Sequence, residues 1–383
     1  MDLNELEFLD LINGLENKYI DDWKSSGNKI IGYYCSLVPE ELLHAAGLMP
    51  YRIRANVSTD TALADAILSR YNCSYVRCSL NLALEGKYDF LDGLIVTTSC
   101  DHIRRMYDIW LRKVDLANNN PDFLLMFISI PHVVTKHGIK FLLEEISMIK
   151  QEIENKYNIK IKNEDIKQSV LLYNKNRELL RKIHGFCSLD DPKLKASEML
   201  KIVIANASVP KEIANQNLEK ILKIIDARKP IKNKTRLMVI GSYIDKPEFF
   251  EIFEDVGGSV VSGFFCNGLR AFYDDVESSN DPIGDLLRRY YEKAYCPRMM
   301  RRHGSRLEFI KNQIDEARVE GVVLERLEFC DLHGVENMML EHELEDLGIP
   351  VLSIDREYLL GDIARFKTRI EAFIEQIKIG VID

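Results

Sequence analysis

The chain alternates short apolar runs with helical patterns in two separate regions, and this alternation constrains the fold more than any other feature. In the first region the apolar runs are KIIGYYCS, MPYRIRA, DGLIVTTS and DFLLMFISIP, with helical patterns at residues 39–46, 59–69 and 101–113 between them. In the second region the runs are TRLMVIGSY, GSVVSGFF, EGVVLERLEF and IPVLSID, with helices such as residues 305–318 between them and a closing helix in ARFKTRIEAFIEQI. Such alternation is typical of parallel sheets covered by helices.

A stretch with long helical periods separates the two regions and includes GIKFLLEEISMIKQEIENKY and EDIKQSVLLYNKNRELLRKIHGF. A chain of 383 residues also exceeds the length at which one hydrophobic core usually stops growing. We therefore predict an α/β protein with two doubly wound parallel-sheet lobes, flavodoxin-like or Rossmann-like, joined by a helical region. The predicted boundaries are residues 1–135 for the N-terminal lobe, 136–230 for the helical bridge and 231–383 for the C-terminal lobe. In such lobes ligands bind at the carboxyl ends of the strands.

The overall charge and the amino-terminal segment exclude several classes of function. A formal net charge of −9 argues against a nucleic-acid surface, because phosphate binding needs an excess of Lys and Arg on one face. The segment MDLNELEFLDLINGLENKY lacks the basic and apolar parts of a signal peptide, and no apolar run approaches the length of a membrane span. We therefore expect a cytoplasmic protein that does not bind membranes.

Eight cysteines in such a chain indicate a reducing compartment, where thiols act as ligands, catalysts or core residues rather than as disulfides. Cys100 and Cys330 both lie where a predicted strand hands over to a helix. Free backbone N–H groups and the helix dipole stabilise a thiolate there. An isolated cysteine is more often a small buried hydrophobe, but two in equivalent settings favour ligands. The matching runs that precede them indicate either an internal duplication or two independent βα units.

The other cysteines are less distinctive. Cys73 and Cys78 lie in RYNCSYVRCSL, where four intervening residues would place both thiols on one face if the segment is helical. Cys266, in FFCNGLR, and Cys296, in AYCPRMMRRHG, could bind a metal or simply pack. Cys35 and Cys187 are interpreted as structural.

Two further patterns concern anionic ligands and nucleotides. The basic stretch Arg298, Arg301, Arg302 and His303 is read as a solvated face, with contact to phosphates of a large anionic ligand as the alternative. No Walker loop, HExxH pair, GxSxG elbow or GxGxxG loop is present in the sequence. Any ATP chemistry is therefore expected to belong to a partner protein.

Several blocks of the sequence resemble one superfamily, that of the 2-hydroxyacyl-CoA dehydratases and class I benzoyl-CoA reductases. The blocks are GYYCSLVPEELLHAAGLMPYRI, NCSYVRCSL, DGLIVTTSCDHIRRMYDIW and the closing TRIEAFIE, in the expected order over nearly the whole chain. The chain is similar to the smaller subunit of the dehydratase D-component, an enzyme of anaerobes. The resemblance implies a [4Fe–4S] cluster held by three cysteines, at positions matching Cys73, Cys100 and Cys330, with one iron open to a non-cysteine ligand or to substrate.

The resemblance also implies partners and a reaction. A separate ATP-hydrolysing activator, itself an iron–sulfur protein, delivers one low-potential electron to a component made of this chain and a homologous second subunit or a second copy. In the dehydratases, a ketyl radical anion of the 2-hydroxyacyl-CoA expels hydroxide and makes the beta proton acidic, so that a 2-enoyl-CoA forms. We expect this lyase activity, with acyl-CoA as substrate.

The residues leave other members of the superfamily open. Ser36 is a candidate to hydrogen-bond the thioester oxygen or to cap a helix, while Glu40 and Glu41 read as favourable charges in a first helical turn. Related dehydratase subunits can carry an acidic residue where Arg52 and Arg54 stand here. One alternative is therefore a benzoyl-CoA reductase-like subunit that reduces an aromatic or enoyl-CoA. Another is a double-cubane [8Fe–9S] reductase of small molecules, with Cys78, Cys266 and Cys296 as possible additional ligands. A third is a subunit that only relays electrons to a partner's active site.

Overall fold

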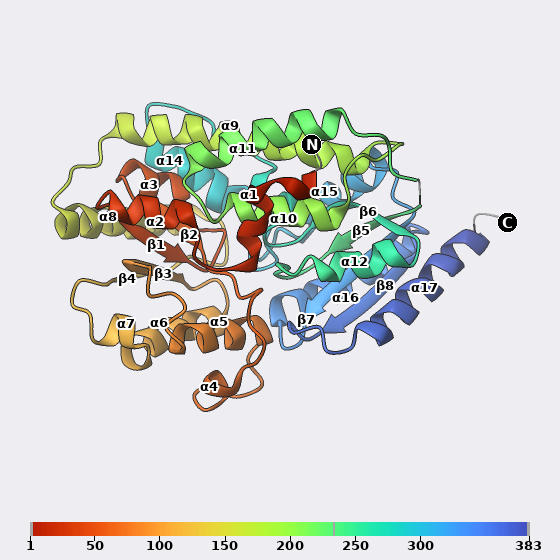
Figure 1. The fold of residues 1–383 in the computed structure, drawn as a ribbon, viewed down its shortest axis with the longest axis horizontal. Helices are drawn as coiled ribbons and strands as arrows, with labels where there is room; N and C mark the ends of the chain where they lie inside the picture. Colours follow the sequence, from red (N-terminus) through yellow and green to blue (C-terminus); the bar gives the residue numbers. More distant parts are fainter. Residues whose placement is uncertain (1–2, 233, 381–383) are drawn as a thin grey trace.

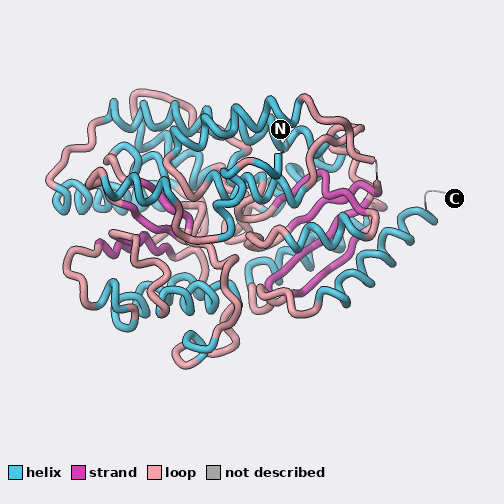
Figure 2. Tube along the Cα trace, in the orientation of Figure 1, coloured by secondary structure: helices cyan, strands magenta, loops and turns pink. Residues whose placement is uncertain are grey.

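Two four-stranded parallel sheets organise the protein. The computed structural model describes residues 3–232 and 234–380. The first sheet has the strand order β2-β1-β3-β4, and the second has the order β6-β5-β7-β8. Their bounds are β1 (Ile30–Tyr33), β2 (Met49–Arg52), β3 (Gly93–Thr97), β4 (Leu124–Ile128), β5 (Thr235–Ile240), β6 (Gly258–Phe264), β7 (Gly321–Leu327) and β8 (Val351–Arg356). Figure 2 shows the two sets of strands enclosed by helices.

All neighbouring strands pair in parallel, and each sheet places its second strand on one side of its first and its third and fourth on the other. This is the doubly wound order, so the predicted fold class is confirmed. The chain reverses direction across the sheet between β1 and β3, and again between β5 and β7. The carboxyl ends of strands at such reversals form crevices that bind ligands.

Helices cover both sheets. In the amino-terminal part they are α1 (Glu7–Asp10), α2 (Lys18–Ser25), α3 (Glu40–Ala45), α4 (Ala62–Asp65), α5 (Ser74–Leu84), α6 (Asp101–Lys113) and α7 (Asp115–Asn118). The central helices are α8 (Lys136–Tyr157), α9 (Asn163–Ser188), α10 (Ala196–Asn206) and α11 (Lys211–Asp226). The last part contains α12 (Glu248–Asp255), α13 (Leu269–Phe272), α14 (Pro282–Leu287), α15 (His303–Glu316), α16 (Asp331–Asp346) and α17 (Ile363–Gly380). In this described part of the chain, no helix combines the length and apolar content needed to cross a membrane.

The helix expected at residues 59–69 is shorter in the structure, where only α4 forms. Two backbone N–H groups, those of Ile67 and Leu68, donate to the same Ala64 carbonyl and close a turn. This turn ends the helix and directs Leu68 into the core, where it is 5% exposed. Burial of one leucine therefore overrides the local helical pattern.

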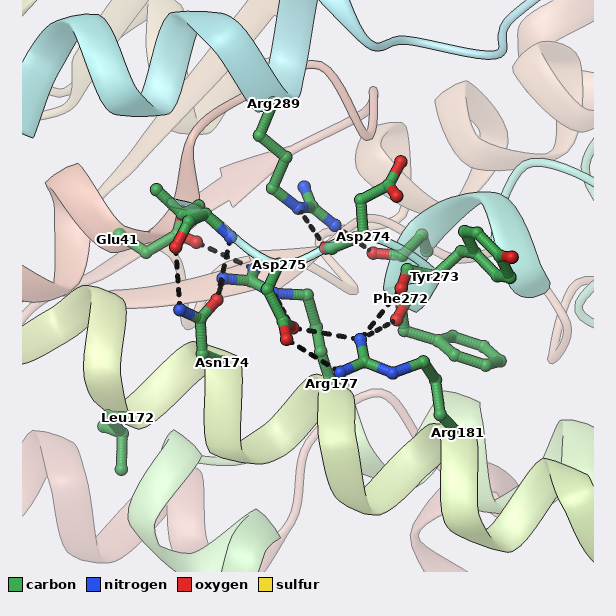
Figure 3. A network of polar contacts seen from close by, with 12 residues as sticks. Glu41, Leu172, Asn174, Arg177, Arg181, Phe272, Tyr273, Asp274, Asp275 and Arg289 are labelled. Carbon is green, nitrogen blue, oxygen red and sulfur yellow. Dashed lines mark hydrogen bonds and ion pairs between the residues drawn. The ribbon is translucent and has the colours of Figure 1, made fainter. Parts of the chain in front are cut away.

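Helix α9 connects the two sheet regions. Figure 1 shows α9 and α11 running along one edge of the molecule, above both sheets. Helix α9 packs against α3, which follows β1, and also against β6 of the second sheet. Figure 3 shows Arg177 and Arg181 of α9 extending toward different partners. Arg177 pairs with Glu41 of α3, and Arg181 pairs with Asp275 beyond α13, each at 2.8 Å.

The Glu41 carboxylate is fully buried, so it is more than the favourable first-turn charge expected from the sequence. It accepts hydrogen bonds from the Arg177 guanidinium and from the Tyr290 hydroxyl, both at 2.8 Å. A buried carboxylate needs such partners because an unpaired buried charge is costly. Glu41 therefore fixes α3 against α9 and against the segment that follows α14.

The chain also crosses between the sheets after β6. Val276, Leu286 and Tyr290 pack in one hydrophobic core with Ile31 and Ile95 of the first sheet. In the same way, Tyr243, Leu327 and Tyr358 contribute to the other core of the first sheet. Because core packing crosses the predicted boundaries, the division at residues 135 and 230 stays a prediction. The shared packing holds the carboxyl ends of the two sheets face to face.

Candidate metal centre

A cavity of about 450 Å³ lies between the carboxyl ends of the two sheets. Loops that follow β1, β3, β5, β6 and β7 all reach it, so both chain reversals open into one space. Its lining includes six of the eight cysteines, together with aromatic, hydroxyl and imidazole side chains. Among the lining residues are Tyr34, Cys35, Ser36, Arg52, Cys73, Tyr75, Cys100, His102, His132, Ser242, Tyr243, Cys266, Cys296, Cys330 and His333.

Three of the cysteines share one backbone setting. Cys73, Cys100 and Cys330 are the N-cap residues of α5, α6 and α16. The Cys100 Sγ accepts a hydrogen bond from the backbone N–H of Ile103 at 3.4 Å. The first N–H groups of a helix have no partner within the helix, so they are free to bind thiolate or sulfide. The structure thus brings together the three cysteines that the resemblance implied, at three helix amino termini.

Burial makes deprotonation of these three thiols unfavourable in the absence of a bound cation. Burial, with a further contribution from Cys330, raises the pKa of Cys73 to about 12. Burial also raises the pKa of Cys100, with a contribution from Cys73, and that of Cys330, with a contribution from Cys100. Backbone N–H groups oppose these increases at all three residues. The thiolate is the form of cysteine that binds metals. A bound metal cation would stabilise the negative charge, so that these buried thiols could lose their protons.

A second trio of cysteines lines the same cavity. Cys35 follows β1, Cys266 follows β6, and Cys296 precedes Pro297 ahead of α15. Burial raises the pKa of Cys296, and the neighbouring Cys266 and Cys35 raise it further. The sequence interpretation left Cys266 and Cys296 open and treated Cys35 as structural. The structure places Cys35 on the cavity wall because β1 ends at Tyr33, two residues earlier.

Cys78 and Cys187 lie outside the cavity lining. Cys78 is fully buried within α5, in the core of the first sheet, and Cys187 is buried in the core around α9 and α10. The expectation that Cys73 and Cys78 share a helical face is wrong. Cys73 caps the helix instead of joining it, and five positions correspond to about 140° of rotation at 3.6 residues per turn.

The basic stretch after Cys296 is not the solvated face that the sequence suggested. Arg298 is only 1% exposed, although Arg301 is exposed. Arg302 donates to the carbonyl of Glu292, and His303 lies between Glu336 and Glu343 at 3.0 and 2.5 Å.

Arg52 and Arg54 stand where related dehydratase subunits can carry an acidic residue. Arg52 lines the cavity. Arg54 instead binds the carbonyls of Leu11, Ile12 and Gly14 and anchors the amino-terminal segment.

Hydroxyl and imidazole groups complete the wall. Ser36 lies on the cavity, and Ser242 donates its hydroxyl to the buried carboxylate of Glu325 at 2.9 Å. Burial lowers the pKa values of His102, His132 and His333, so these imidazoles are neutral near pH 7. The sequence reasoning missed the three histidines, although two of them lie two and three positions after Cys100 and Cys330.

The donor set on this cavity consists of thiols, the side chains that hold iron–sulfur clusters. Among residues 3–232 and 234–380, no three His, Cys, Asp or Glu side chains are placed to hold one metal ion together. A cluster differs, because its thiolates bind separate iron atoms and are spread around it. Six thiols on one buried cavity, three of them at helix amino termini, match that arrangement.

Fold and site together define a two-lobed parallel α/β protein with a cysteine-lined cavity between the lobes. The chain belongs to the family of the 2-hydroxyglutaryl-CoA dehydratase D-component, whose sequence model matches residues 35–377. The resemblance found in the sequence is thereby confirmed.

Named relatives include both dehydratases and a reductase. The chain is 23% identical over 375 residues to one of the subunits of benzoyl-CoA reductase from Thauera aromatica, covering 93% of each chain. It is 22% identical over 376 residues to the (R)-phenyllactyl-CoA dehydratase beta subunit of Clostridium sporogenes, covering 97% of this chain and 98% of the relative. It is 26% identical over 366 residues to the beta subunit of (R)-2-hydroxyglutaryl-CoA dehydratase from Acidaminococcus fermentans, covering 93% and 94%. The sequence identities to the dehydratase subunits and to the reductase subunit are so similar that they favour neither dehydration nor reduction.

Proposed function

We propose that this chain is the iron–sulfur subunit of a low-potential reductase of small molecules within the dehydratase family, and that its cavity holds a double-cubane [8Fe–9S] cluster. The observation that carries the proposal is the placement of two cysteine trios on one cavity. Cys73, Cys100 and Cys330 form one trio, and Cys35, Cys266 and Cys296 form the other. A single cubane held by three cysteines would leave the second trio without a role.

The residues around the cysteines support a redox site. The N–H groups that open α5, α6 and α16 would hydrogen-bond the thiolates and sulfides, and such bonds adjust a cluster's reduction potential. When bound, the cluster would supply one-electron reduction at low potential. The rings of Tyr75 and Tyr243, whose centroids lie 4.3 Å apart, line the cavity and would limit access of water to a bound cluster.

Partners follow from the same reasoning. The sequence contains no nucleotide-binding loop, so electrons driven by ATP hydrolysis would come from a separate iron–sulfur activator. The relatives are named as subunits, which supports a second, homologous subunit or a second copy of this chain. A cytoplasmic location agrees with the need of such clusters for a reducing compartment.

The second candidate is an ATP-dependent radical (R)-2-hydroxyacyl-CoA dehydratase, or a benzoyl-CoA reductase-like subunit. It is favoured by the names of the relatives and by the position of Ser36 on the cavity wall, where its hydroxyl could bind a thioester oxygen. In this case Cys73, Cys100 and Cys330 would hold one [4Fe–4S] cluster. The second trio would then bind no iron.

Iron counting separates the two candidates. The chain is reconstituted without oxygen, and iron and acid-labile sulfide are measured in the wild type and in Cys35→Ser, Cys266→Ser and Cys296→Ser. About eight irons per chain in the wild type, with substantial loss in each variant, would support the double cubane. About four irons, unaffected by these substitutions but lost in Cys73→Ser, Cys100→Ser and Cys330→Ser, would replace it with the single-cluster dehydratase or reductase.

Cys187→Ser serves as the matched control, because Cys187 is a buried cysteine away from the cavity. A wild type that binds no iron after reconstitution would exclude both candidates. Turnover is then assayed with the activator and ATP on 2-hydroxyacyl-CoA and aromatic acyl-CoA substrates. Formation of a 2-enoyl-CoA would assign the dehydratase reaction.

A further inference from the structure

Three arginines close to the cysteines have no carboxylate partner among the described residues: Arg52, Arg270 and Arg298. Arginine stays protonated in proteins, so each brings a full positive charge to the site. Elsewhere in the core, Arg177, Arg306 and Arg356 pair with the buried carboxylates of Glu41, Glu336 and Glu325. Because an uncompensated buried charge is costly, the three unpaired arginines require an explanation.

Arg52 lines the cavity at the end of β2 and is 8% exposed. Its guanidinium carbon lies 5.5 Å from the ring centroid of Tyr33 and 5.3 Å from that of Tyr243. Its buried Nε has no hydrogen-bond partner within the described structure. Two aromatic faces thus hold the cation in the wall of the cavity without neutralising it.

Arg298 is bound by neutral acceptors. Its Nε donates to the Thr98 carbonyl at 2.7 Å, and one terminal nitrogen donates to the Pro131 carbonyl at 3.0 Å. The other donates to the Thr98 hydroxyl at 3.1 Å and to the Ile130 carbonyl. Burial lowers the pKa of Arg298, whereas the nearby Cys35, Cys296 and Cys100 raise it. Arg298 is therefore a buried guanidinium near both trios that is bound only by neutral acceptors.

Arg270 contacts a cysteine directly. One terminal nitrogen donates to the Cys266 Sγ at 2.8 Å. The other terminal nitrogen is buried and has no hydrogen-bond partner among residues 3–232 and 234–380. The guanidinium also lies 5.5 Å from the ring centroid of Phe264.

We infer that Arg52, Arg270 and Arg298 are the counter-charges of an anionic iron–sulfur cluster in this cavity, and that they set its reduction potential. The inference rests on the proposed function. A cluster bound by thiolates is anionic, and each added electron makes it more so. Cations a few ångströms away in a medium of low dielectric constant stabilise the reduced form and raise the potential. The arginines act through the cluster and are positioning residues.

The test compares Arg52→Gln and Arg270→Gln with Arg112→Gln, a control that removes the same charge from an exposed site in the last turn of α6. Anaerobic redox titration, followed by EPR, measures the midpoint potential of each reconstituted protein. We expect Arg52→Gln and Arg270→Gln to become harder to reduce by at least tenfold in the one-electron equilibrium constant, which corresponds to about 59 mV. Arg52→Lys restores the charge and should restore most of the potential.

A second readout does not depend on the cluster. Arg52→Gln removes a cation that has no ion pair, so thermal unfolding of the iron-free protein should occur at or above the wild-type temperature. Iron binding with an unchanged potential in both variants would overturn the inference and leave the proposed function intact. A wild type without iron would overturn the proposed function itself. Iron lost from Arg52→Gln but kept by Arg52→Lys would support the counter-charge role.

Discussion

Cys100 and Cys330 occupy equivalent positions in the two sheets. Cys100 is the N-cap of α6, which follows β3, and Cys330 is the N-cap of α16, which follows β7. Each of these strands pairs with the first strand of its own sheet. Because both sheets have the same order and face one cavity, the two thiols reach that cavity from opposite lobes. The equivalence shows how one βα arrangement, used twice, builds a single site.

Replacing either of these cysteines should remove metal without unfolding the protein. Cys100→Ser and Cys330→Ser are expected to lower bound iron to a similar extent, because both are N-caps on the same cavity, while the unfolding temperature of the iron-free protein stays close to wild type. Cys78→Ala provides the contrast, because Cys78 is buried in the core. It should keep full iron and lower the free energy of unfolding by roughly 1 kcal/mol. Iron loss in Cys78→Ala would contradict this assignment.

The buried pair between Glu41 and Arg177 should contribute strongly to stability. Glu41→Gln leaves the buried Arg177 charge with only the more distant and exposed Asp275 carboxylate, at 3.7 Å, and breaking a buried pair typically costs about 3–5 kcal/mol. Urea unfolding followed by circular dichroism measures the loss. Glu178→Gln on the same helix α9 is the control, since its pair with Lys182 is exposed and contributes about 0.3–0.5 kcal/mol. Equal effects of the two substitutions would show that the pair does not tie the lobes together.

The same carboxylate should make stability depend on pH. Burial raises the pKa of Glu41, but the guanidinium groups of Arg177 and Arg289 outweigh burial and hold the pKa below its ordinary value of 4.5. Below that value the unfolded chain binds a proton that the folded chain does not, so stability falls as pH decreases. Urea midpoints at several pH values between about 6 and 3 should therefore converge for the wild type and Glu41→Gln as the folded carboxylate becomes protonated. A gap that stays constant over this range would contradict the depressed pKa.

A glycine beside the cavity should not tolerate a side chain. A Cβ at Gly241 would overlap the carboxylate of Glu325, which accepts hydrogen bonds from the backbone N–H and hydroxyl of Ser242. Gly241→Ala should therefore lower the free energy of unfolding by about 1–3 kcal/mol and reduce iron retention. Gly185→Ala is the control, because a Cβ there meets nothing within 4 Å in helix α9. That control should be neutral or more stable by up to about 1 kcal/mol. An equally stable Gly241→Ala would show that Glu325 can move without cost.

The sequence predicted the strands well because their burial leaves a clear signal. Strands such as β3 and β7 are covered on both faces, so they appear as continuous apolar runs. Cys100 and Cys330 could be placed at strand-to-helix junctions for the same reason, since the end of an apolar run locates the carboxyl end of a strand. Their role as ligands stays a prediction that iron counting can test.

The second cysteine trio could not be recognised in this way. The apolar run around β1 continues through Tyr34 and Cys35, whereas the strand ends at Tyr33 because the chain there turns toward the cavity. The prediction that Arg298 belongs to a solvated face is also wrong, because its side chain is buried. Its acceptors, Thr98, Ile130 and Pro131, lie far away in the sequence, so nothing near Arg298 indicated burial. Both errors concern contacts that exist only after the two lobes have come together.

The distribution of the cavity cysteines along the chain has a consequence for biosynthesis. Cys35 belongs to the first βα unit and Cys330 to the β7–α16 unit, so the ribosome must synthesise the chain beyond residue 330 before the cavity can close. Until then the early thiols have no enclosing wall and remain open to oxidation or to capture of other metals. Insertion of the proposed cluster would therefore follow synthesis of the segment that carries Cys330, under conditions that keep oxygen away.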